Sequence, residues 1–336
     1  MSKHRVIRYV SAPVGMPDES CFALSEEPLP VPAEGEVLAR THYLSIDPYF
    51  RRMMGGGHGQ YARPLRIGDV MVGRGAGVVV ESRHPDFKPG DGVQGEFGWR
   101  EHALLKGDGL RKLPDDLKPL SLSLGVVGQS GATAVVGLFD IARMKPGETV
   151  VVSAAAGAVG SVVGQLARMK GGRAIGIAGG PEKCRHVVAD LGFDECIDYK
   201  AGPISAALAK AAPDGIDVYF DNVGGDILDA ALAHMRQDGR IAVCGQISQY
   251  SLGERQALRN GGAILDKCLT IQGFRIGNHL ARRDAALAEM LALWRAGRLR
   301  WRETVADGLA SAPRAFLNML AGGNIGKQVV RLEAAR

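Results

Sequence analysis

One stretch, residues 148–164, restricts the fold more than any other part of the sequence. Its first half, 149–153, is a β-branched run without polar alternation, which is typical of a strand buried on both faces. Beyond Val159 the apolar residues recur at helical spacing. Between the two halves, Gly157 and Gly160 keep two glycines of the G-x-G-x-x-G pattern, with alanine in the first place. A strand, a tight glycine turn and a helix in this order predict a dinucleotide site, because bare backbone and helix N–H groups can approach a pyrophosphate.

After this turn the sequence alternates between short apolar runs and segments with helical spacing. This alternation predicts βαβ units and therefore an α/β domain with a doubly wound parallel sheet of the Rossmann type. The expected strands are 149–153, 173–178, 217–221, 240–244 and 269–274, and the expected helices are 159–170, 181–191, 204–211, 226–235 and 284–295.

The chain before this region has a different sequence pattern. From residue 5 to 109, short strand-like runs are separated by proline and glycine, which predicts a compact, irregular β-barrel-like domain. Residues 121–142 are small and apolar with helical spacing and suit a passage into the next domain. The final strand-like run, 326–332, is expected to return to the sheet of the first domain. We therefore divide the chain into 1–124, 125–298 and a returning tail, 299–336.

Composition excludes several classes of protein. The 336 residues carry a net charge of +5 from 41 basic and 36 acidic residues, and the basic residues are scattered, so no nucleic-acid surface is expected. The five cysteines form no C-x-x-C pair, which fits a reducing cytoplasm rather than a disulfide framework. The N-terminus lacks the apolar segment of a secretory signal. The long apolar run 150–167 contains glycine, serine and glutamine that fit the dinucleotide turn better than a membrane.

The second expected strand indicates which cofactor binds. An NAD site usually ends this strand with an acid that binds the ribose 2′-hydroxyl, but here the strand ends in Gly-Gly-Pro at 179–181. Glu182 follows at a helix start, where acids commonly serve the helix dipole. Lys183 and Arg185 come next, and Tyr199 and Lys200 follow further on. A missing acid beside basic residues predicts a 2′-phosphate and hence NADPH, although the two basic residues of the helix could also be ordinary surface charges.

Six segments resemble the zinc-independent medium-chain dehydrogenase/reductases, and within them the group of prostaglandin reductases (leukotriene B4 12-hydroxydehydrogenases), plant double-bond reductases and bacterial curcumin reductase-like enzymes. The likeness extends over nearly the whole chain. The segments are 45–51, 154–164, 220–225, 244–250, 271–274 and 322–327.

The resemblance implies a GroES-like catalytic domain around an inserted Rossmann domain, a homodimer, and reduction of the carbon–carbon double bond of α,β-unsaturated ketones and aldehydes by NADPH. It also implies roles for individual residues. Gly157, Ala158, Val159 and Gly160 would hold the pyrophosphate, and Lys183 and Tyr199 would meet the 2′-phosphate. The rest of the cofactor would be lined by Asn222, Cys244, Gly245, Ile247, Ser248, Tyr250, Phe274, Arg275, Ile276 and Asn324.

No metal site is expected. Zinc-dependent relatives carry a Gly-His-Glu motif where residues 69–77 here read Asp-Val-Met-Val-Gly-Arg-Gly-Ala-Gly. A catalytic zinc needs about three protein ligands, and His58, His84 and His102 have no ligand spacing. An alcohol dehydrogenase is therefore excluded by the lack of a metal-binding motif.

Metal-free conjugate reduction needs a hydrogen-bond donor for the substrate oxygen, which becomes negative as hydride arrives. A phenol suits this role, and Tyr61 and Tyr49 are the candidates, with Tyr250 expected to pack on the cofactor. Relatives often place a tyrosine where this chain has Asp266, so that role is not transferred. Two alternatives stay open, an NADPH-dependent quinone oxidoreductase and a non-catalytic NADPH-binding protein.

Overall fold

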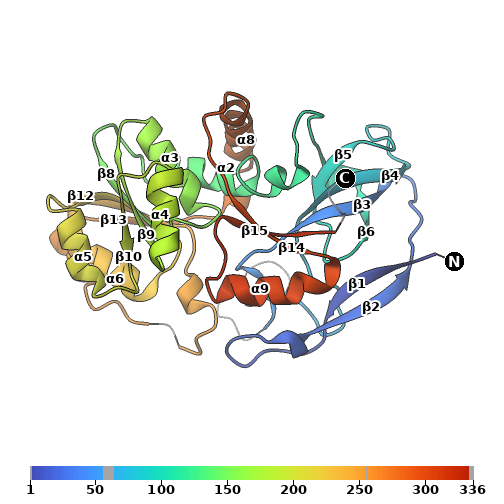
Figure 1. The fold of residues 1–336 in the computed structure, drawn as a ribbon, viewed down its shortest axis with the longest axis horizontal. Helices are drawn as coiled ribbons and strands as arrows, with labels where there is room; N and C mark the ends of the chain where they lie inside the picture. Colours follow the sequence, from blue (N-terminus) through green and yellow to red (C-terminus); the bar gives the residue numbers. More distant parts are fainter. Residues whose placement is uncertain (1, 56–63, 255, 333–336) are drawn as a thin grey trace. The chain divides into compact units, whose positions relative to one another are not determined.

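The structure, a computed structural model, describes residues 2–55, 64–254 and 256–332, and the chain forms two compact units (Figure 1). The first unit combines Met1–Leu124 with Glu303–Arg336, and the second unit is the continuous segment Gly125–Arg302. None of the helices in the described residues has the length and apolar character that crossing a bilayer requires.

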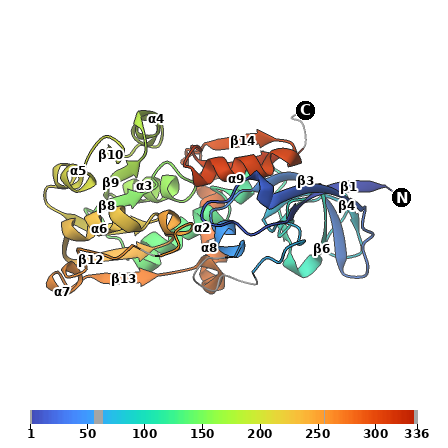
Figure 2. The ribbon, with the colours of Figure 1, turned by 90° about the horizontal axis from the view of Figure 1, so that it is seen from below.

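The second unit is built on a six-stranded parallel sheet with the order β10-β9-β8-β11-β12-β13. Numbered within the unit, this order is 3-2-1-4-5-6, the doubly wound order of a dinucleotide-binding fold. Figure 2 shows β10 and β13 at opposite edges of the sheet. The strands are β8 (Thr149–Ser153), β9 (Arg173–Ala178), β10 (Glu195–Asp198), β11 (Ile216–Asp221), β12 (Met235–Val243) and β13 (Thr270–Gly273).

Helices cover both faces of this sheet because alternate strand residues are apolar on each side. On one face, Val151, Ile175 and Tyr219 pack with Leu208 and Leu228 of two helices, α5 and α6. On the other face, α3 lies against β8 and β9, and α2 packs against α3 and α8. The helices are α2 (Gln129–Val135), α3 (Gly160–Met169), α4 (Pro181–Arg185), α5 (Ile204–Ala211), α6 (Gly225–His234), α7 (Ala263–Asp266) and α8 (Leu280–Arg295).

The first unit contains a seven-stranded sheet in the order β14-β15-β3-β4-β5-β7, with β6 also paired to β3. Strand β15, from the C-terminal part of the chain, lies between β14 and the N-terminal strand β3. The elements are β1 (Lys3–Tyr9), β2 (Phe22–Pro28), β3 (Glu36–Ser45), α1 (Phe50–Met53), β4 (Gly75–Ser82), β5 (Gly92–Gly95), β6 (His102–Lys106), β7 (Arg111–Lys112), β14 (Glu303–Asp307), α9 (Ala312–Leu320) and β15 (Lys327–Arg331).

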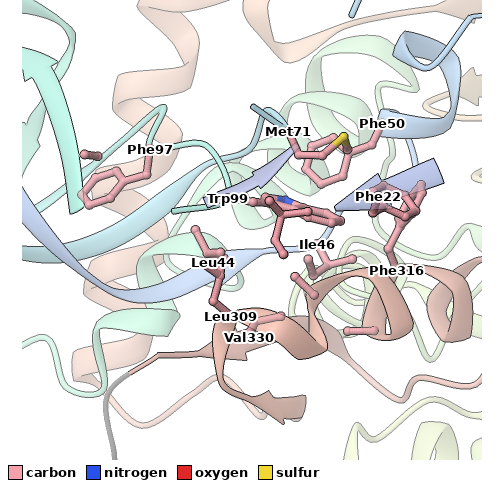
Figure 3. Packing of buried hydrophobic residues seen from close by; sticks show 14 of the residues in the cluster. Phe22, Leu44, Ile46, Phe50, Met71, Phe97, Trp99, Leu309, Phe316 and Val330 are labelled. Carbon is pink, nitrogen blue, oxygen red and sulfur yellow. The ribbon is translucent and has the colours of Figure 1, made fainter. Parts of the chain in front are cut away.

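The core of the first unit joins the two ends of the chain. Phe316, on helix α9, is fully buried, and its ring lies 5.9 Å from that of Phe50 and 6.2 Å from those of Phe22 and Trp99 (Figure 3). Aromatic pairs at such distances add to the free energy gained by burial alone. The C-terminal helix is therefore part of the same hydrophobic core as the N-terminal strands.

The observed α/β class, with a Rossmann sheet and a separate sheet domain, confirms the expected fold, while several local predictions were wrong. The helix expected over 181–191 is α-helical only to Arg185 and continues as a π-helical segment, His186–Asp190. Strand β12 begins at Met235, which we had placed in the preceding helix. The edge strands β10 and β14 were not predicted.

The second unit also keeps residues 299–302, which we assigned to the returning tail. The side chain of Gln165, on α3, both donates to the carbonyl oxygen of Arg300 and accepts from its N–H, at 2.9 and 2.8 Å. These two hydrogen bonds hold the segment on the second unit until β14 begins.

Candidate cofactor-binding site

The C-terminal ends of β8 and β11 lie side by side at the point where the strand order reverses. Ser153 ends β8, and its hydroxyl accepts the N–H of Asn222 at 2.8 Å and donates to Asp221 at 3.2 Å. The side-chain amide of Asn222 donates back to the carbonyl oxygen of Ser153 at 2.8 Å. In doubly wound sheets, ligands bind in the crevice beyond this switch point, so these hydrogen bonds fix the base of the candidate site.

The glycine turn between β8 and α3 is closed by short backbone contacts. The N–H of Gly157 donates to Ala154 O at 2.8 Å, and Ala154 itself has a φ of 48°. A Cβ atom on Gly160 would lie 2.4 Å from Ala154 O, whereas one on Gly157 would lie 3.1 Å from the same atom. Gly160 is therefore required for the close approach of α3 to β8, and Gly157 leaves the outer side of the turn without a side chain.

The donors needed for a pyrophosphate come from the same turn. Ala158, Val159 and Gly160 stand at the start of α3, where the first N–H groups of a helix have no acceptor within the helix. These groups and the helix dipole favour an anion at this end. The turn thus fits a dinucleotide by its bare backbone, its donors and its position at the switch point.

A second cluster surrounds the end of β9, where the ribose of an adenosine would lie in this fold. Asp198, at the end of β10, accepts the N–H of Gly180 at 2.8 Å and that of Lys200 at 3.0 Å. These backbone hydrogen bonds lower the pKa of Asp198. Both hydrogen bonds go to Oδ1, so this oxygen joins the loop after β9 to the loop after β10.

The basic and aromatic groups predicted for the 2′-phosphate meet at this corner. The ring of Tyr199 covers Gly179, because a Cβ atom there would lie 2.8 Å from Tyr199 Cε1. Burial and the positive charge of Lys200 lower the pKa of Lys183, against a smaller effect of Glu182. Glu182 itself lies 3.7 Å from Arg302. Two lysine charges near each other and a half-buried ammonium favour binding of an anion here.

Asp221 forms the buried centre of the switch point. Its Oδ1 atom accepts hydrogen bonds from Tyr219, Val223 and Gly224 at 3.0–3.1 Å, in addition to the one from Ser153. The other carboxyl oxygen is buried without a hydrogen-bond partner among the described residues. Burial raises the pKa of Asp221, although the backbone and hydroxyl donors oppose the shift.

The segment after β12 lies against the loop after β11. Ile247 and Ser248 donate their N–H groups to Asn222 O and Val223 O at 3.3 and 3.1 Å, and the Ser248 hydroxyl donates to Val223 O at 2.7 Å. The Tyr250 hydroxyl accepts the N–H of Gln246 at 3.1 Å, which folds the segment into a compact turn. The structure thus brings Asn222, Ser248 and Tyr250 together.

The remaining cofactor candidates of the second unit have different surroundings. Cys244 lies beside Asp221, and burial together with this carboxyl raises the pKa of its thiol to about 12. A Cβ atom on its neighbour Gly245 would lie 3.2 Å from the Tyr250 hydroxyl. Phe274 and Ile276 are buried, and the Phe274 ring packs edge-on against Phe220 at 6.1 Å. Arg275 is exposed between them. The side chain of Phe274 therefore belongs to the core of the unit.

Three candidates belong to the first unit. The half-buried Tyr49 packs its ring edge-on against Phe50 at 4.7 Å, next to the hydrophobic core. The side chain of Asn324 donates to Gly326 O at 2.8 Å just before β15. Tyr61 lies outside the described residues.

Sequence reasoning missed the residues that hold the site together. Ser153 and Asp221 were considered only as strand ends, and Asp198 was not considered. Ser153 and Asp221 each follow a buried run of β-branched or aromatic residues with a hydroxyl or carboxyl group at the last strand position, and this signal could have identified them. Asp198 ends a strand with one buried residue, so no such signal marks it.

Among the described residues, no group of three or more His, Cys, Asp or Glu side chains is arranged to hold a metal ion.

Comparison with known proteins agrees with this geometry. Residues 5–113 match the family model described as the N-terminal domain of oxidoreductase, and residues 158–293 match the model described as zinc-binding dehydrogenase. The chain is 44% identical to the NADPH-dependent curcumin reductase of Escherichia coli, over 98% of each protein, and 42% identical to rat prostaglandin reductase 1, over 94% of this chain and 95% of the relative. The crystal structure of CurA from Vibrio vulnificus in complex with NADPH is 42% identical, with a TM-score of 0.92 over 98% of this chain and 100% of the other.

The Rossmann switch point, the glycine turn and these matches define the chain as a medium-chain dehydrogenase/reductase. Within that class it belongs to the zinc-independent group that contains the curcumin reductase and the prostaglandin reductases. The resemblance noted from the sequence is therefore confirmed.

Proposed function

We propose that the protein is an NADPH-dependent reductase of the carbon–carbon double bond of α,β-unsaturated ketones and aldehydes. The observation that carries the cofactor preference is the corner at the end of β9. Its carboxylate, Asp198, is held by two backbone N–H groups, while Lys183 and Lys200 supply positive charge. A 2′-phosphate matches that charge, and the end of β9 itself, Gly179-Gly180-Pro181, carries no acidic side chain of the kind that usually binds a ribose 2′-hydroxyl.

The substrate class follows from the relatives. The E. coli relative is named for NADPH and curcumin, and the rat relative for prostaglandins. We infer that this chain likewise acts on a small molecule with a carbonyl conjugated to a double bond. When bound, NADPH supplies the hydride for the β-carbon of that substrate.

The second unit would hold and orient the cofactor. In this assignment Lys183, Lys200 and the Tyr199 hydroxyl bind the 2′-phosphate, and the backbone of residues 157–160 binds the pyrophosphate. The turn at 244–250, fixed by Asn222 and Tyr250, shapes the wall towards the nicotinamide, and the backbone of 274–276 continues it. The side chains of Phe274 and Ile276 support that wall from inside the core.

A tyrosine hydroxyl would supply the catalytic hydrogen bond. As hydride reaches the β-carbon, the substrate oxygen becomes an enolate, and a neutral phenol stabilises it by donating a hydrogen bond. Tyr61 is our first candidate for this donor and Tyr49 the second. Asn324 is assigned to the cofactor only through the resemblance.

We also propose a cytoplasmic homodimer. The support for a dimer is β13, which is an edge strand of the parallel sheet and is exposed along its whole length. An exposed sheet edge tends to pair with another strand. The support for the cytoplasm is the set of five cysteines, all present as free thiols.

The test is to follow oxidation of NADPH with a panel of enals, enones, quinones and saturated ketones. Turnover of enals and enones, with no turnover of the saturated ketones, is expected. Activity on quinones alone would replace the proposal with a quinone oxidoreductase. Tight NADPH binding without turnover of any electrophile would identify a non-catalytic binding protein.

A further inference from the structure

Two cysteines that lie twelve residues apart in the sequence meet in the second unit. Cys184 lies on helix α4 and Cys196 on the edge strand β10, and their Sγ atoms are 3.1 Å apart. Both side chains are partly buried rather than enclosed. Nothing in the assigned cofactor contacts uses either thiol.

The space for this pair comes from a glycine on the neighbouring strand. Cys196 is paired in register with Gly176 on β9. A Cβ atom on Gly176 would lie 3.4 Å from the sulfur of Cys196 and 2.8 Å from Val187. Because Gly176 has no side chain, α4 and the segment after it can approach the sheet, and this approach brings Cys184 to Cys196.

The pair joins the two segments that form the corner at the end of β9. Cys184 follows Lys183 directly. Cys196 is two residues before Asp198, whose carboxylate binds the N–H of Gly180. A covalent link between the two sulfurs would therefore connect the segment that carries Lys183 to the segment that carries Tyr199.

We propose that Cys184 and Cys196 form a reversible intramolecular disulfide when the protein meets a peroxide, and that this disulfide weakens binding of NADPH. The effect on NADPH binding rests on the function proposed above. The formation of the disulfide depends only on the chemistry of the two thiols.

The reaction balances with hydrogen peroxide or an organic hydroperoxide as the oxidant. The thiolate of one cysteine attacks the peroxide O–O bond, which breaks to give a sulfenic acid and release water or an alcohol. The second thiolate then attacks the sulfenic sulfur, the S–S bond forms as the S–O bond breaks, and the oxygen leaves as water. The two cysteines lose two electrons and two protons in total, and the peroxide is reduced.

The geometry sets both the rate and the effect of this step. Burial raises the pKa of both thiols, so few thiolates are present near neutral pH and oxidation is expected to be slow. The sulfurs must approach from 3.1 Å to the ~2.05 Å of a disulfide. That movement displaces α4 or β10 and so changes the spacing of Lys183 from Tyr199 and Lys200.

The first experiment treats the full-length protein with hydrogen peroxide, counts free thiols and maps peptides by mass spectrometry. We expect the count to fall from five to three, with a single linked peptide pair containing Cys184 and Cys196. The Cys268→Ser variant, which changes an exposed cysteine, is the control and should form the same link. A link through another cysteine, or oxidation without any linked peptide, would overturn the proposal.

The second experiment measures the Kd of NADPH and of NADH for the reduced and oxidised protein. Oxidation should raise the Kd for NADPH by at least about fivefold, as expected for a displaced charge-assisted contact, with little change for NADH and recovery after dithiothreitol. Cys184→Ser and Cys196→Ser should each abolish the response to oxidation. Because two separate variants carry the same expectation, misfolding of one of them does not decide the result.

An equal rise in Kd for NADPH and NADH, or no rise for either, would overturn the proposed effect on NADPH binding. If the reduced protein shows no preference for NADPH, the proposed function fails together with the effect on binding. The peptide map still decides whether the disulfide forms.

Discussion

The side-chain amide of Asn222 binds the carbonyl oxygen of Ser153 across 2.8 Å and ties the loop after β11 to the end of β8. The sequence predicts that Asn222 lines the cofactor; the structure shows its amide holding together the two loops that flank the switch point. Asn222→Ala should lower the free energy of unfolding by about 1 kcal/mol, the value of one net hydrogen bond. Asn222→Asp should cost more, because a carboxylate oxygen would face the carbonyl oxygen. Thermal unfolding of both variants measures the difference, and an Asp variant as stable as the wild type would refute this role.

The charge at the end of β9 is tested by Lys183→Ala. This change should raise the KM for NADPH by about tenfold or more, since a charge-assisted contact to phosphate is lost. The KM for NADH should change little. Lys210→Ala, which alters an exposed lysine on α5 of the same unit, is the matched control. Equal losses for the two cofactors would remove Lys183 from the 2′-phosphate site.

Alanine substitutions at the two glycines of the turn should have different effects, one on stability and the other on cofactor binding. Gly160→Ala places a Cβ atom 2.4 Å from Ala154 O, so α3 must move and the protein should lose stability. Gly157→Ala meets the same atom at 3.1 Å, so the fold should tolerate it better. The added methyl group should weaken NADPH binding, because the proposed pyrophosphate site lies on this turn. Thermal unfolding and NADPH titration together separate the two effects.

Gly202→Ala provides the control for these variants, because nothing lies within 4 Å of a Cβ atom at that position. Its unfolding temperature and NADPH affinity should match the wild type. The opposite pattern, with Gly157→Ala the less stable variant and Gly160→Ala unaffected in stability, would contradict the assigned roles.

Tyr61→Phe tests the proposed hydrogen bond to the enolate. Loss of one donor to a developing oxyanion typically lowers kcat by about 10²–10³, and the Kd of NADPH should stay unchanged. Tyr49→Phe should have a smaller effect, because the ring of Tyr49 packs against Phe50 beside the core. An unaltered kcat for Tyr61→Phe would assign the donor to another group.

The buried carboxyl of Asp221 predicts a pH dependence of stability. Because burial raises its pKa above the ordinary 3.8, the folded protein holds this proton at pH values where the unfolded chain has released it. The wild type should therefore lose stability relative to Asp221→Asn as the pH rises above about 4, until the folded pKa is passed. Urea unfolding of both proteins from pH 4 to 7 measures this difference, and a constant difference would show that the carboxyl keeps its ordinary pKa.

Sequence patterns identified the centre of the parallel sheet more reliably than its edges. Strands β8 and β9 and helix α5 have the predicted bounds, because continuous apolar runs or clear helical spacing end at glycine, proline or charged residues. Strand β10 has four residues, of which only Ile197 is buried, so its pattern is too short to recognise. Its position depends on pairing with β9 rather than on its own sequence.

The features of the candidate site also differ in whether the sequence alone could predict them. The glycine turn and the run of basic residues after β9 are local features, and both could be located from the sequence. The hydrogen bonds of Asp198 to Gly180 and of Ser153 to Asp221 depend on which strands are neighbours and in which register. The contact of Cys184 with Cys196 depends on that register as well, so sequence spacing alone gave no sign of it.

The position of β15 between β14 and β3 bears on the order in which the protein folds during its synthesis. The second unit is one continuous segment and can fold as soon as Arg302 has left the ribosome. The first unit begins earlier in the chain, but until the tail is synthesised its sheet lacks the two neighbouring strands β14 and β15 beside β3, and its core lacks Phe316. The domain that starts the sequence is therefore the last to be completed, and its early strands must stay soluble while the nucleotide-binding unit forms.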